Sequence, residues 1–186
     1  GLACAAGELC VGGGCVSEHG LVDATIVAEL QGRSGQPGPF LPTSIVAHAL
    51  AVGGSARLRE QVLPAMISGE AVAAWAWADP SGDHDDGAGV TLIERGDGLV
   101  ASGERGYVLE APSADHLLVP TTLDGRRVHV LVPSSAPGVT IVPLQGLDLA
   151  RRFAHLHLDD VAVAADGVVE IDATSLLPTA LVLVLA

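Results

Sequence analysis

The spacing of apolar residues changes near Gly69, and this change constrains the fold more than any other feature of the sequence. Before Gly69, apolar residues recur every three or four positions, which is the period of a helix. After it, the segment 71–78 alternates, so that Trp75 and Trp77 share one face and alanines occupy the other. The periods therefore predict an α+β chain, with a helical segment first and strands after it.

Three helices are expected before the change of period. Each begins with a residue whose side chain can accept a hydrogen bond from the first helical turn. Gly32 follows the first helix, and Pro64 is expected to end the third because proline inside a helix removes a backbone hydrogen bond. The predicted ranges and N-caps are 23–31 with Asp23, 43–52 with Thr43, and 56–63 with Ser55.

Short strands separated by turn sequences are expected after the change. Asp124-Gly125 gives the clearest hairpin signal, because both residue types tolerate the positive φ of a two-residue turn. About seven or eight such strands predict a closed or nearly closed antiparallel β-barrel, or a sandwich. The predicted strands are 71–78, 89–95, 98–109, 116–123, 126–133, 138–144, 153–163 and 168–171.

Composition limits the classes of partner. Hydrophobic residues make up 49% of the 186 residues and charged residues only 17%, which is too apolar for a disordered chain. No uninterrupted apolar run reaches the ~18 residues of a membrane helix, so we predict no membrane span and expect the apolar surplus to be buried against protein. The net charge of −13, with no lysine, argues against nucleic acid as a partner.

Both ends of the sequence suggest a longer natural product. There is no initiator methionine, and residues 172–186 run almost wholly apolar after a helix cap at Asp172 or Thr174. We expect this run to begin a further helical region and to lack cover within this chain. The 186-residue chain by itself is therefore expected to self-associate.

The three cysteines all lie early, at Cys4, Cys10 and Cys15, with His19 close behind. These four residues have the types of a zinc site, but they lack the tight Cys pair of structural sites, so ordinary thiols are favoured and no metal is predicted. An odd number of cysteines without a secretory signal favours the cytoplasm. His48, which has no second ligand at a helical spacing, is expected in the core or an interface.

Three polar groups elsewhere are weaker candidates. The acidic run 83–86 is interpreted as a solvated loop, with metal binding as the alternative. His155 and His157 lie two residues apart on one strand face, as a ligand pair or as two surface histidines. Arg151 and Arg152 could hold a phosphate or carboxylate, or pair with the many acids of the chain.

The order of the segments resembles the acyl-CoA dehydrogenase family. The matching pieces follow one another from about residue 12 to residue 186, and their order is more specific than any one of them. They are LPAMISGE (63–70), AVAAWAWADPSGD (71–83), GDGLVASGERGYVLEAPSADHLLVP (96–120), VHVLVPSSAPGVTIVPL (128–144) and LDLARRFAHLHLDDVAV (147–163).

The resemblance implies an FAD-dependent oxidoreductase that dehydrogenates an acyl-CoA between its α and β carbons. In the family a glutamate removes the α-proton and a hydride passes to flavin N5; that glutamate is expected beyond Ala186, so no catalytic residue is assigned. An electron-transfer acceptor protein, a role in lipid metabolism and a homo- or hetero-oligomer are also implied. The implied domains are a helical domain at 1–69, a middle β-barrel domain at 70–171, and the start of a C-terminal helical domain at 172–186.

Six positions match the family residues that pack on the flavin. The chain departs from the family at several of them: Ala78 replaces threonine, Asp79 replaces glutamate, and Leu109 replaces a hydroxyl residue. Arg105 stands where the family has lysine, and 81–83 reads Ser-Gly-Asp instead of Gly-Ser-Asp. The matching positions are Trp75, Trp77, Ala78, Asp79, Tyr107 and Leu109.

Two functions follow from these matches and departures. The retained aromatic strand and the Asp-Pro strand end favour an FAD-dependent dehydrogenase, of which this chain is a fragment that is inactive alone. The lost hydroxyls at Ala78 and Leu109 favour a non-catalytic subunit that pairs with an active partner as a scaffold. A flavin-binding enzyme would purify yellow, whereas a scaffold would be colourless without its partner.

Overall fold

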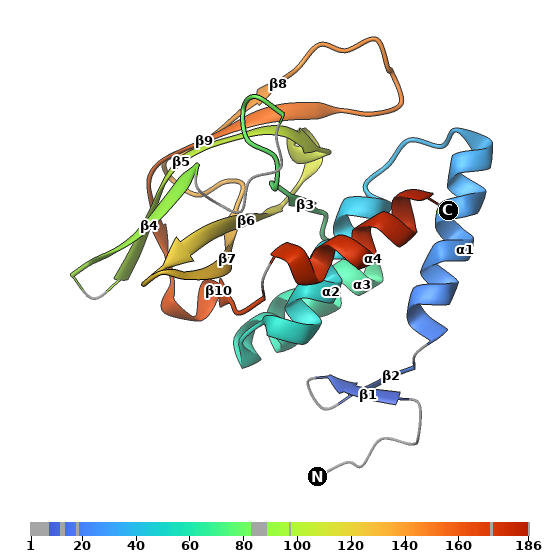
Figure 1. Cartoon of the computed structure of the whole chain (residues 1–186), viewed down its shortest axis with the longest axis horizontal. Coiled ribbons are helices and arrows are strands. Elements are labelled where there is room, and N and C mark those ends of the chain that lie inside the picture. The colour runs from blue at the N-terminus through green and yellow to red at the C-terminus, as the bar shows by residue number, and fades with distance from the viewer. Residues whose placement is uncertain are drawn as a thin grey trace.

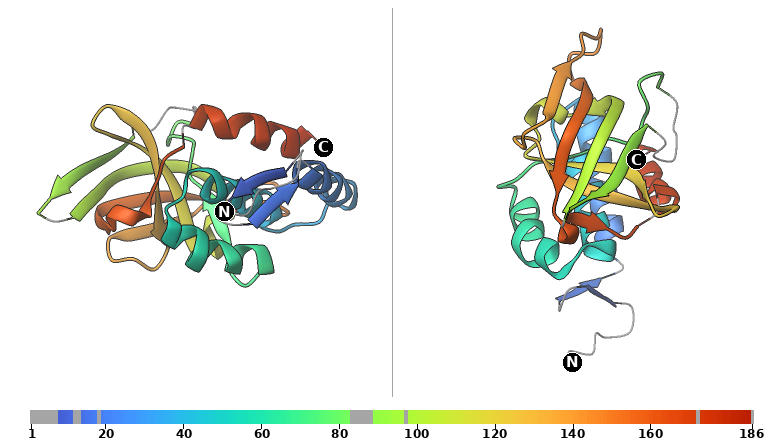
Figure 2. Two further views of the ribbon diagram at one scale, coloured as in Figure 1. Left: turned by 90° about the horizontal axis from the view of Figure 1, so that it is seen from below. Right: turned by 90° about the vertical axis from the view of Figure 1, so that its left-hand side faces the viewer.

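Helices gather beside one side of a curved mixed sheet, as Figures 1 and 2 show for the computed structural model. The structure describes residues 8–11, 14–17, 19–82, 89–96, 98–171 and 173–185. The α-helices are α1 (His19–Ser34), α2 (Phe40–Gly53), α3 (Leu63–Ser68) and α4 (Ala173–Leu185). The other helical turns are η1 (Leu58–Val62), η2 (Ala111–Ser113) and η3 (Ala165–Gly167).

Within these ranges, two short strands near the N-terminus form a hairpin, and eight further strands form the main sheet. The hairpin strands are β1 (Glu8–Val11) and β2 (Gly14–Ser17). The strands of the main sheet are β3 (Ala73–Trp75), β4 (Val90–Arg95), β5 (Gly98–Leu109), β6 (His116–Leu123), β7 (Arg126–Pro133), β8 (Val139–Pro143), β9 (Phe153–Val163) and β10 (Val168–Val169). The predicted ranges of β5, β6, β7 and β9 are therefore confirmed, whereas β4 and β8 are shorter by one and two residues and β3 and β10 are shorter than the predicted first and last strands.

The main sheet is not closed by its described strands, so the predicted barrel is not confirmed. Its hydrogen-bonded order is β10-β7-β6-β4-β5-β9-β8, and β3 pairs with β6. The sheet is also mixed, because β3 and β4 both run parallel to β6. The β6–β7 hairpin turns at Asp124 and Gly125, whose φ values of 50° and 74° confirm the predicted two-residue turn.

The helix ends differ from the prediction in two places. Asp23 is not an N-cap, because α1 already begins at His19 and continues through Gly32. Thr43 is not an N-cap either, because Pro42 fits the first turn of α2, where its missing N–H is not needed. The Thr43 hydroxyl instead lies 3.1 Å from the backbone N and 3.2 Å from the backbone O of Ala73, and so joins α2 to β3.

The third predicted helix is longer than expected. Ser55 caps it as predicted, since its hydroxyl accepts a hydrogen bond of 3.3 Å from the backbone N–H of Leu58. Pro64 does not end it: a π-helical turn at η1 carries the chain into α3, and this wider turn accommodates the proline ring. The helix ends at Gly69, which has a φ of 78°.

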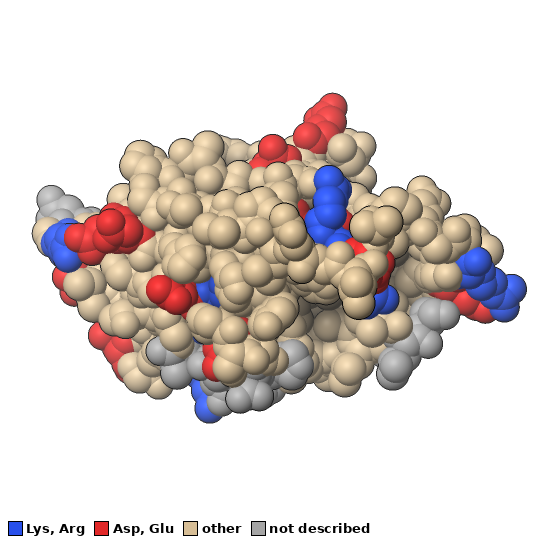
Figure 3. Space-filling view, turned by 90° about the horizontal axis from the view of Figure 1, so that it is seen from above, with Lys and Arg blue, Asp and Glu red and all other residues tan. Residues whose placement is uncertain are grey.

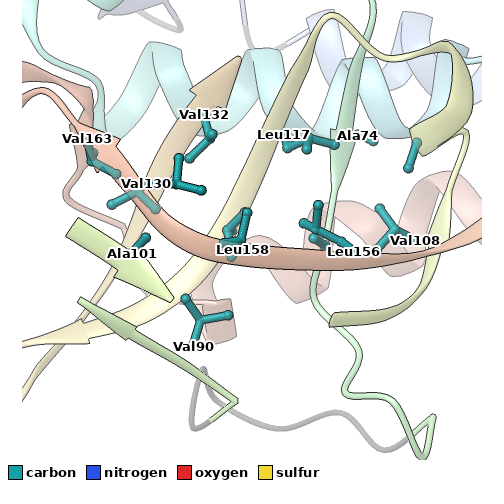
Figure 4. Packing of buried hydrophobic residues seen from close by; sticks show 14 of the residues in the cluster. Ala74, Val90, Ala101, Val108, Leu117, Val130, Val132, Leu156, Leu158 and Val163 are labelled. Carbon is teal, nitrogen blue, oxygen red and sulfur yellow. The ribbon is translucent and has the colours of Figure 1, made fainter. Parts of the chain in front are cut away.

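Two apolar clusters form the core. One lies among the strands, and Figure 4 shows its side chains pointing toward one another from β3, β5, β6, β7 and β9. The other lies between the sheet and the helices; it includes Val46 and Leu50 of α2, Trp75 of β3, and Leu118 of β6. The strand end that leads out of β3 therefore starts from the boundary between the two layers.

Helix α4 packs against α1 and α2, which corrects the expectation that its apolar run lacks cover. Leu176, Ala180 and Leu183 are buried, while Leu181 and Val184 on another face are exposed. The apolar run is thus covered on one side, because α1 and α2 pack against it there. In the part of the chain that the structure describes, no helix is long and apolar enough to cross a membrane.

Candidate functional site

Tyr107 is the most unusual of the predicted site residues. It lies in β5 where the pairing with β9 shifts register between Arg105 and Val108. Its φ of 49° is in the left-handed region, which costs a non-glycine residue about 1–3 kcal/mol, and its side chain is 47% exposed. Bulges of this kind redirect a side chain, and an exposed aromatic ring on strained backbone is typical of a binding site.

The strand end after β3 lies beside this bulge. The backbone N–H of Gly106 donates a hydrogen bond of 2.9 Å to the carbonyl oxygen of Ala78. A Cβ atom at Gly106 would overlap the carbonyl oxygen of Asp79. A Cβ atom at Gly82 would lie 3.3 Å from the Tyr107 ring. Close approach of backbone at two glycines therefore holds residues 78–82 against Tyr107.

Asp79 holds the turn that follows. Its carboxylate oxygen Oδ1 accepts hydrogen bonds from the backbone N of Ser81, at 2.8 Å, and from the Ser81 hydroxyl, at 2.7 Å. This is the local pattern by which aspartate fixes a turn two residues ahead. The Asp79 side chain therefore fixes the conformation of the turn, and the backbone of residues 78–82 lies beside Tyr107.

The two tryptophans do share a face, but their surroundings differ. Their rings stack with centroids 5.0 Å apart and an interplanar angle of 21°. Trp75 is only 6% exposed and belongs to the core between the sheet and the helices, whereas Trp77 is half-buried at its edge. Trp75 can therefore act on a site only through Trp77.

His129 is a residue of this region that the sequence reasoning missed. It is buried in β7 and accepts at Nε2 a hydrogen bond of 3.1 Å from Trp75 Nε1. Because the indole nitrogen can only donate, the Nε2 atom accepts, and Nδ1–H donates to the carbonyl oxygen of Ile171 at 2.9 Å. A histidine within the apolar run VHVLV was the available signal.

The end of β5 carries a second missed residue. Glu110 follows half-buried Leu109, is 1% exposed, and has a left-handed φ of 60°. Arg152 Nη2 donates to its carboxylate at 2.6 Å, and the Glu110 backbone N–H donates to the Arg152 carbonyl at 2.7 Å. Arg151 lies 3.7 Å from Asp148. Of the two predictions for these arginines, pairing with acids is the one confirmed.

His155 and His157 lie on the outer face of β9, where neighbouring Ala154, Leu156 and Leu158 point into the core. The His155 ring lies 5.7 Å from the Tyr107 ring, and His157 Nδ1 lies 3.3 Å from a carboxylate oxygen of Glu104. No group of three metal-ligating side chains occurs among the described residues. Both histidines therefore lie at the surface, as one of the two interpretations expected.

The other candidate residues from the sequence were not found in this region. His48 is exposed on α2, so of its two predicted places the core is wrong and an interface stays a prediction. The buried face of that helix includes Ile45, Val46, Ala49 and Leu50. Backbone pairing places Cys10 opposite Cys15 in the β1–β2 hairpin. Cys4 and the acidic run 83–86 lie outside the described residues.

The Arg105 side chain lies in the interior of the sheet and not on its surface. It is fully buried, and its Nη2 donates a hydrogen bond of 3.1 Å to the carbonyl oxygen of Pro120.

On the face shown in Figure 3 most of the surface is uncharged, with acidic and basic side chains in small groups. A hollow of about 400 Å³ lies at the other end of β5, beside Glu94, Leu99 and Arg126, and none of the six predicted site residues lines it.

Comparison with known proteins gives these observations a context. No family model matches the chain. Cyclohexane-1-carbonyl-CoA dehydrogenase of Geobacter metallireducens is 27% identical over 161 residues, which cover 82% of this chain and 42% of that protein. Acyl-CoA dehydrogenase FadE29 of Mycobacterium tuberculosis is 25% identical over 157 residues, covering 81% and 41%.

A solved structure agrees with these relatives. The ChsE4-ChsE5 complex from Mycobacterium tuberculosis contains a chain that superposes with a TM-score of 0.77 at 26% identity, over 87% of this chain and 43% of that chain. These relatives and this structure together support membership of the acyl-CoA dehydrogenase family. Sequence identity to these proteins is low, and the chain spans less than half the length of each of them.

Proposed function

We propose that this chain supplies part of the flavin-facing wall of an FAD-dependent acyl-CoA dehydrogenase. The observation that carries the proposal is the Tyr107 bulge, which presents a strained, exposed ring beside the strand end at Ala78 in a chain of this family. Exposed aromatic rings fixed by backbone are suited to stack against a flat cofactor ring. When bound, FAD would accept the hydride that leaves the β-carbon of the substrate.

The residues present fit a flat aromatic group in part. Tyr107 offers a stacking face, and the packing of Gly82 and Gly106 keeps the loop close to it. Ala78 and Leu109 offer no side-chain donor, so each position lacks one hydrogen bond, worth ~1 kcal/mol. The fit thus rests on stacking and backbone more than on side-chain hydrogen bonds.

Five of the six predicted residues receive a role at the cofactor in this proposal, and Trp75 supports Trp77 from the core through their stacked rings. Tyr107 stacks on the cofactor, Ala78 and Leu109 line its edge, and Trp77 closes the side next to the helices. Asp79 acts indirectly, because its carboxylate is used to hold the turn at Ser81.

The base that removes the α-proton is proposed to lie beyond Ala186, with an acyl-CoA as the substrate and an electron-transfer protein as the acceptor. An oligomer, the cytoplasmic location and the domain division at 69/70 and 171/172 belong to the same proposal. The share of the relatives' length that the chain covers, 41% and 42%, supports seeking the remaining machinery elsewhere.

A non-catalytic subunit is the second candidate. The observation in its favour is that Ala78 is buried and Leu109 half-buried, both without a hydroxyl where the family resemblance places one. The related solved structure is that of a complex of two differently named proteins, ChsE4 and ChsE5. For such a subunit, the Tyr107 surface contacts a partner's residues instead of a flavin.

Flavin content of the protein isolated from its native source separates the two candidates. The enzyme is expected to carry FAD and to be bleached by an acyl-CoA, for which cyclohexane-1-carbonyl-CoA is the first choice because a relative is named for it. Tyr107→Ala is expected to lower flavin occupancy more than Tyr107→Phe, because only alanine removes the ring. A colourless protein that is not bleached would support the scaffold, whereas equal flavin occupancy in both variants would mean that the Tyr107 ring is ordinary packing of the sheet.

A further inference from the structure

We infer that His155 is a positioning residue for Tyr107, one that sets the orientation of the tyrosine ring at the proposed flavin-facing wall. The inference rests on the proposed function for its consequence, but its geometry is independent of any cofactor. The two rings lie with centroids 5.7 Å apart and planes tilted by 57°. Separation and tilt both fall in the range that aromatic pairs prefer.

Tyr107 needs such a contact because the strand ladder does not hold it. The register of β5 with β9 runs from Arg105, opposite Leu156, to Val108, opposite Ala154, and passes over the residues between them. A bulged residue is left out of the regular pairing, so side-chain packing has to fix its direction. An exposed ring without such packing would sample several rotamers.

The ring is held from two sides. Gly82 of the loop after β3 lies so near that a Cβ atom there would be 3.3 Å from Tyr107 Cε2. His155 projects from the outer face of β9, next to the edge strand β8, where its backbone partner is Val142. The loop and the histidine come from different parts of the chain, and Tyr107 keeps one orientation only while both are in place.

His157 provides a matched control within the same strand. It lies two residues further along the same face, with a similar partial exposure, but its contact is Glu104, whose carboxylate oxygen is 3.3 Å from Nδ1. A change at His157 therefore alters the outer face of β9 without touching the Tyr107 ring. If this face had only a structural role, changes at His155 and at His157 would have the same effect on the Tyr107 ring.

The first test uses the fact that Tyr107 is the sole tyrosine of the chain. With ring-labelled tyrosine, NMR spectra of the full 186-residue protein report on this one side chain. We expect His155→Ala to shift and broaden or average the ring signals, His155→Phe to retain an ordered ring, and His157→Ala to leave the signals unchanged. Unchanged signals in His155→Ala, or equal changes in His157→Ala, would overturn the inference.

The second test measures FAD affinity by fluorescence titration, with the same substitutions made in the protein as it is isolated from its native source. Loss of an aromatic pair predicts about 2- to 10-fold weaker FAD binding for His155→Ala, with recovery in His155→Phe and no change in His157→Ala. If the unchanged protein binds no FAD, the proposed function fails while the NMR result still decides the orientation of Tyr107. If FAD binds but His155→Ala binds it equally well, the role of His155 at the site is refuted while the proposed function stands.

Discussion

The indole N–H of Trp75 donates a 3.1 Å hydrogen bond to Nε2 of His129, and this bond joins β3 to β7 inside the core. Because the other ring nitrogen of His129 lies 2.9 Å from the carbonyl oxygen of Ile171, one imidazole also holds the segment that leads into α4. A buried donor or acceptor left without a partner costs about 1–3 kcal/mol. The pair is therefore expected to matter for stability and to hold Trp75 under Trp77.

His129→Leu is expected to lower the free energy of unfolding by about 2–4 kcal/mol, because it leaves both the Trp75 donor and the Ile171 acceptor unpaired. Chemical denaturation followed by tryptophan fluorescence measures this loss. His157→Leu, on the outer face of β9, is the control and is expected to change stability by less than about 0.5 kcal/mol. A similar loss in both variants would show that the hydrogen bonds of His129 are not responsible.

Gly106→Ala is expected to destabilise the protein by about 1–3 kcal/mol, because a Cβ atom there would overlap the carbonyl oxygen of Asp79 and force the strand end away. Gly32→Ala in α1 meets nothing within 4 Å. It is expected to stabilise by about 0.5–1 kcal/mol, since alanine is the better helix former. Thermal unfolding of the two variants should move the midpoint in opposite directions, and a stabilising Gly106→Ala would refute the close approach.

Arg152→Ala is expected to cost about 1–3 kcal/mol, because Glu110 is 1% exposed and would keep a buried carboxylate without its 2.6 Å guanidinium partner. Arg151→Ala removes only an exposed pair with Asp148 at 3.7 Å and should cost less than about 1 kcal/mol. Urea denaturation of the two variants gives the comparison. Equal losses would mean that burial of Glu110 does not determine the effect.

Acid should weaken the fold through His116. Burial lowers the pKa of this imidazole, and nearby Asp115 only partly opposes the shift. When the pKa of a histidine is lower in the folded than in the unfolded protein, its contribution to the free energy of unfolding is fully present above its ordinary pKa of about 6.5. That contribution is lost as the pH falls below this value, because the unfolded state then binds the proton more readily. We expect the free energy of unfolding to fall between about pH 7 and pH 5, and to fall less steeply in His116→Gln. An unchanged slope in that variant would assign the acid sensitivity to another group.

Local sequence signals correctly predicted much of the strand pattern. Alternation located β4, β5, β6, β7 and β9, and Asp124-Gly125 located a hairpin, because both signals depend on neighbours along the chain. Helix ends were predicted less well. Thr43 and Pro64 have clear local preferences, yet contact with Ala73 and a π-helical turn determined their places.

In the candidate site, too, some features were predictable from the sequence and others depend on tertiary contacts. Tyr107 and the strand end at Ala78 were predicted through the order of family-like segments, whereas the positive φ of Tyr107 comes from the register shift against β9. The contacts of His129 with Trp75, of Glu110 with Arg152 and of His155 with Tyr107 join residues 42 or more positions apart. No periodicity within one strand reports on such pairs.

The sequence by itself determined the order of helical and extended segments, the hairpin turn at Asp124 and the family resemblance, since each of these is encoded in a run of adjacent residues. Only the tertiary structure decided that the sheet stays open, that α4 is partly covered by α1 and α2, and that Trp75 is a core residue while Tyr107 faces outward. The physical reason is that burial depends on which surfaces meet in space, and an aromatic side chain can pack either in a core or against a ligand.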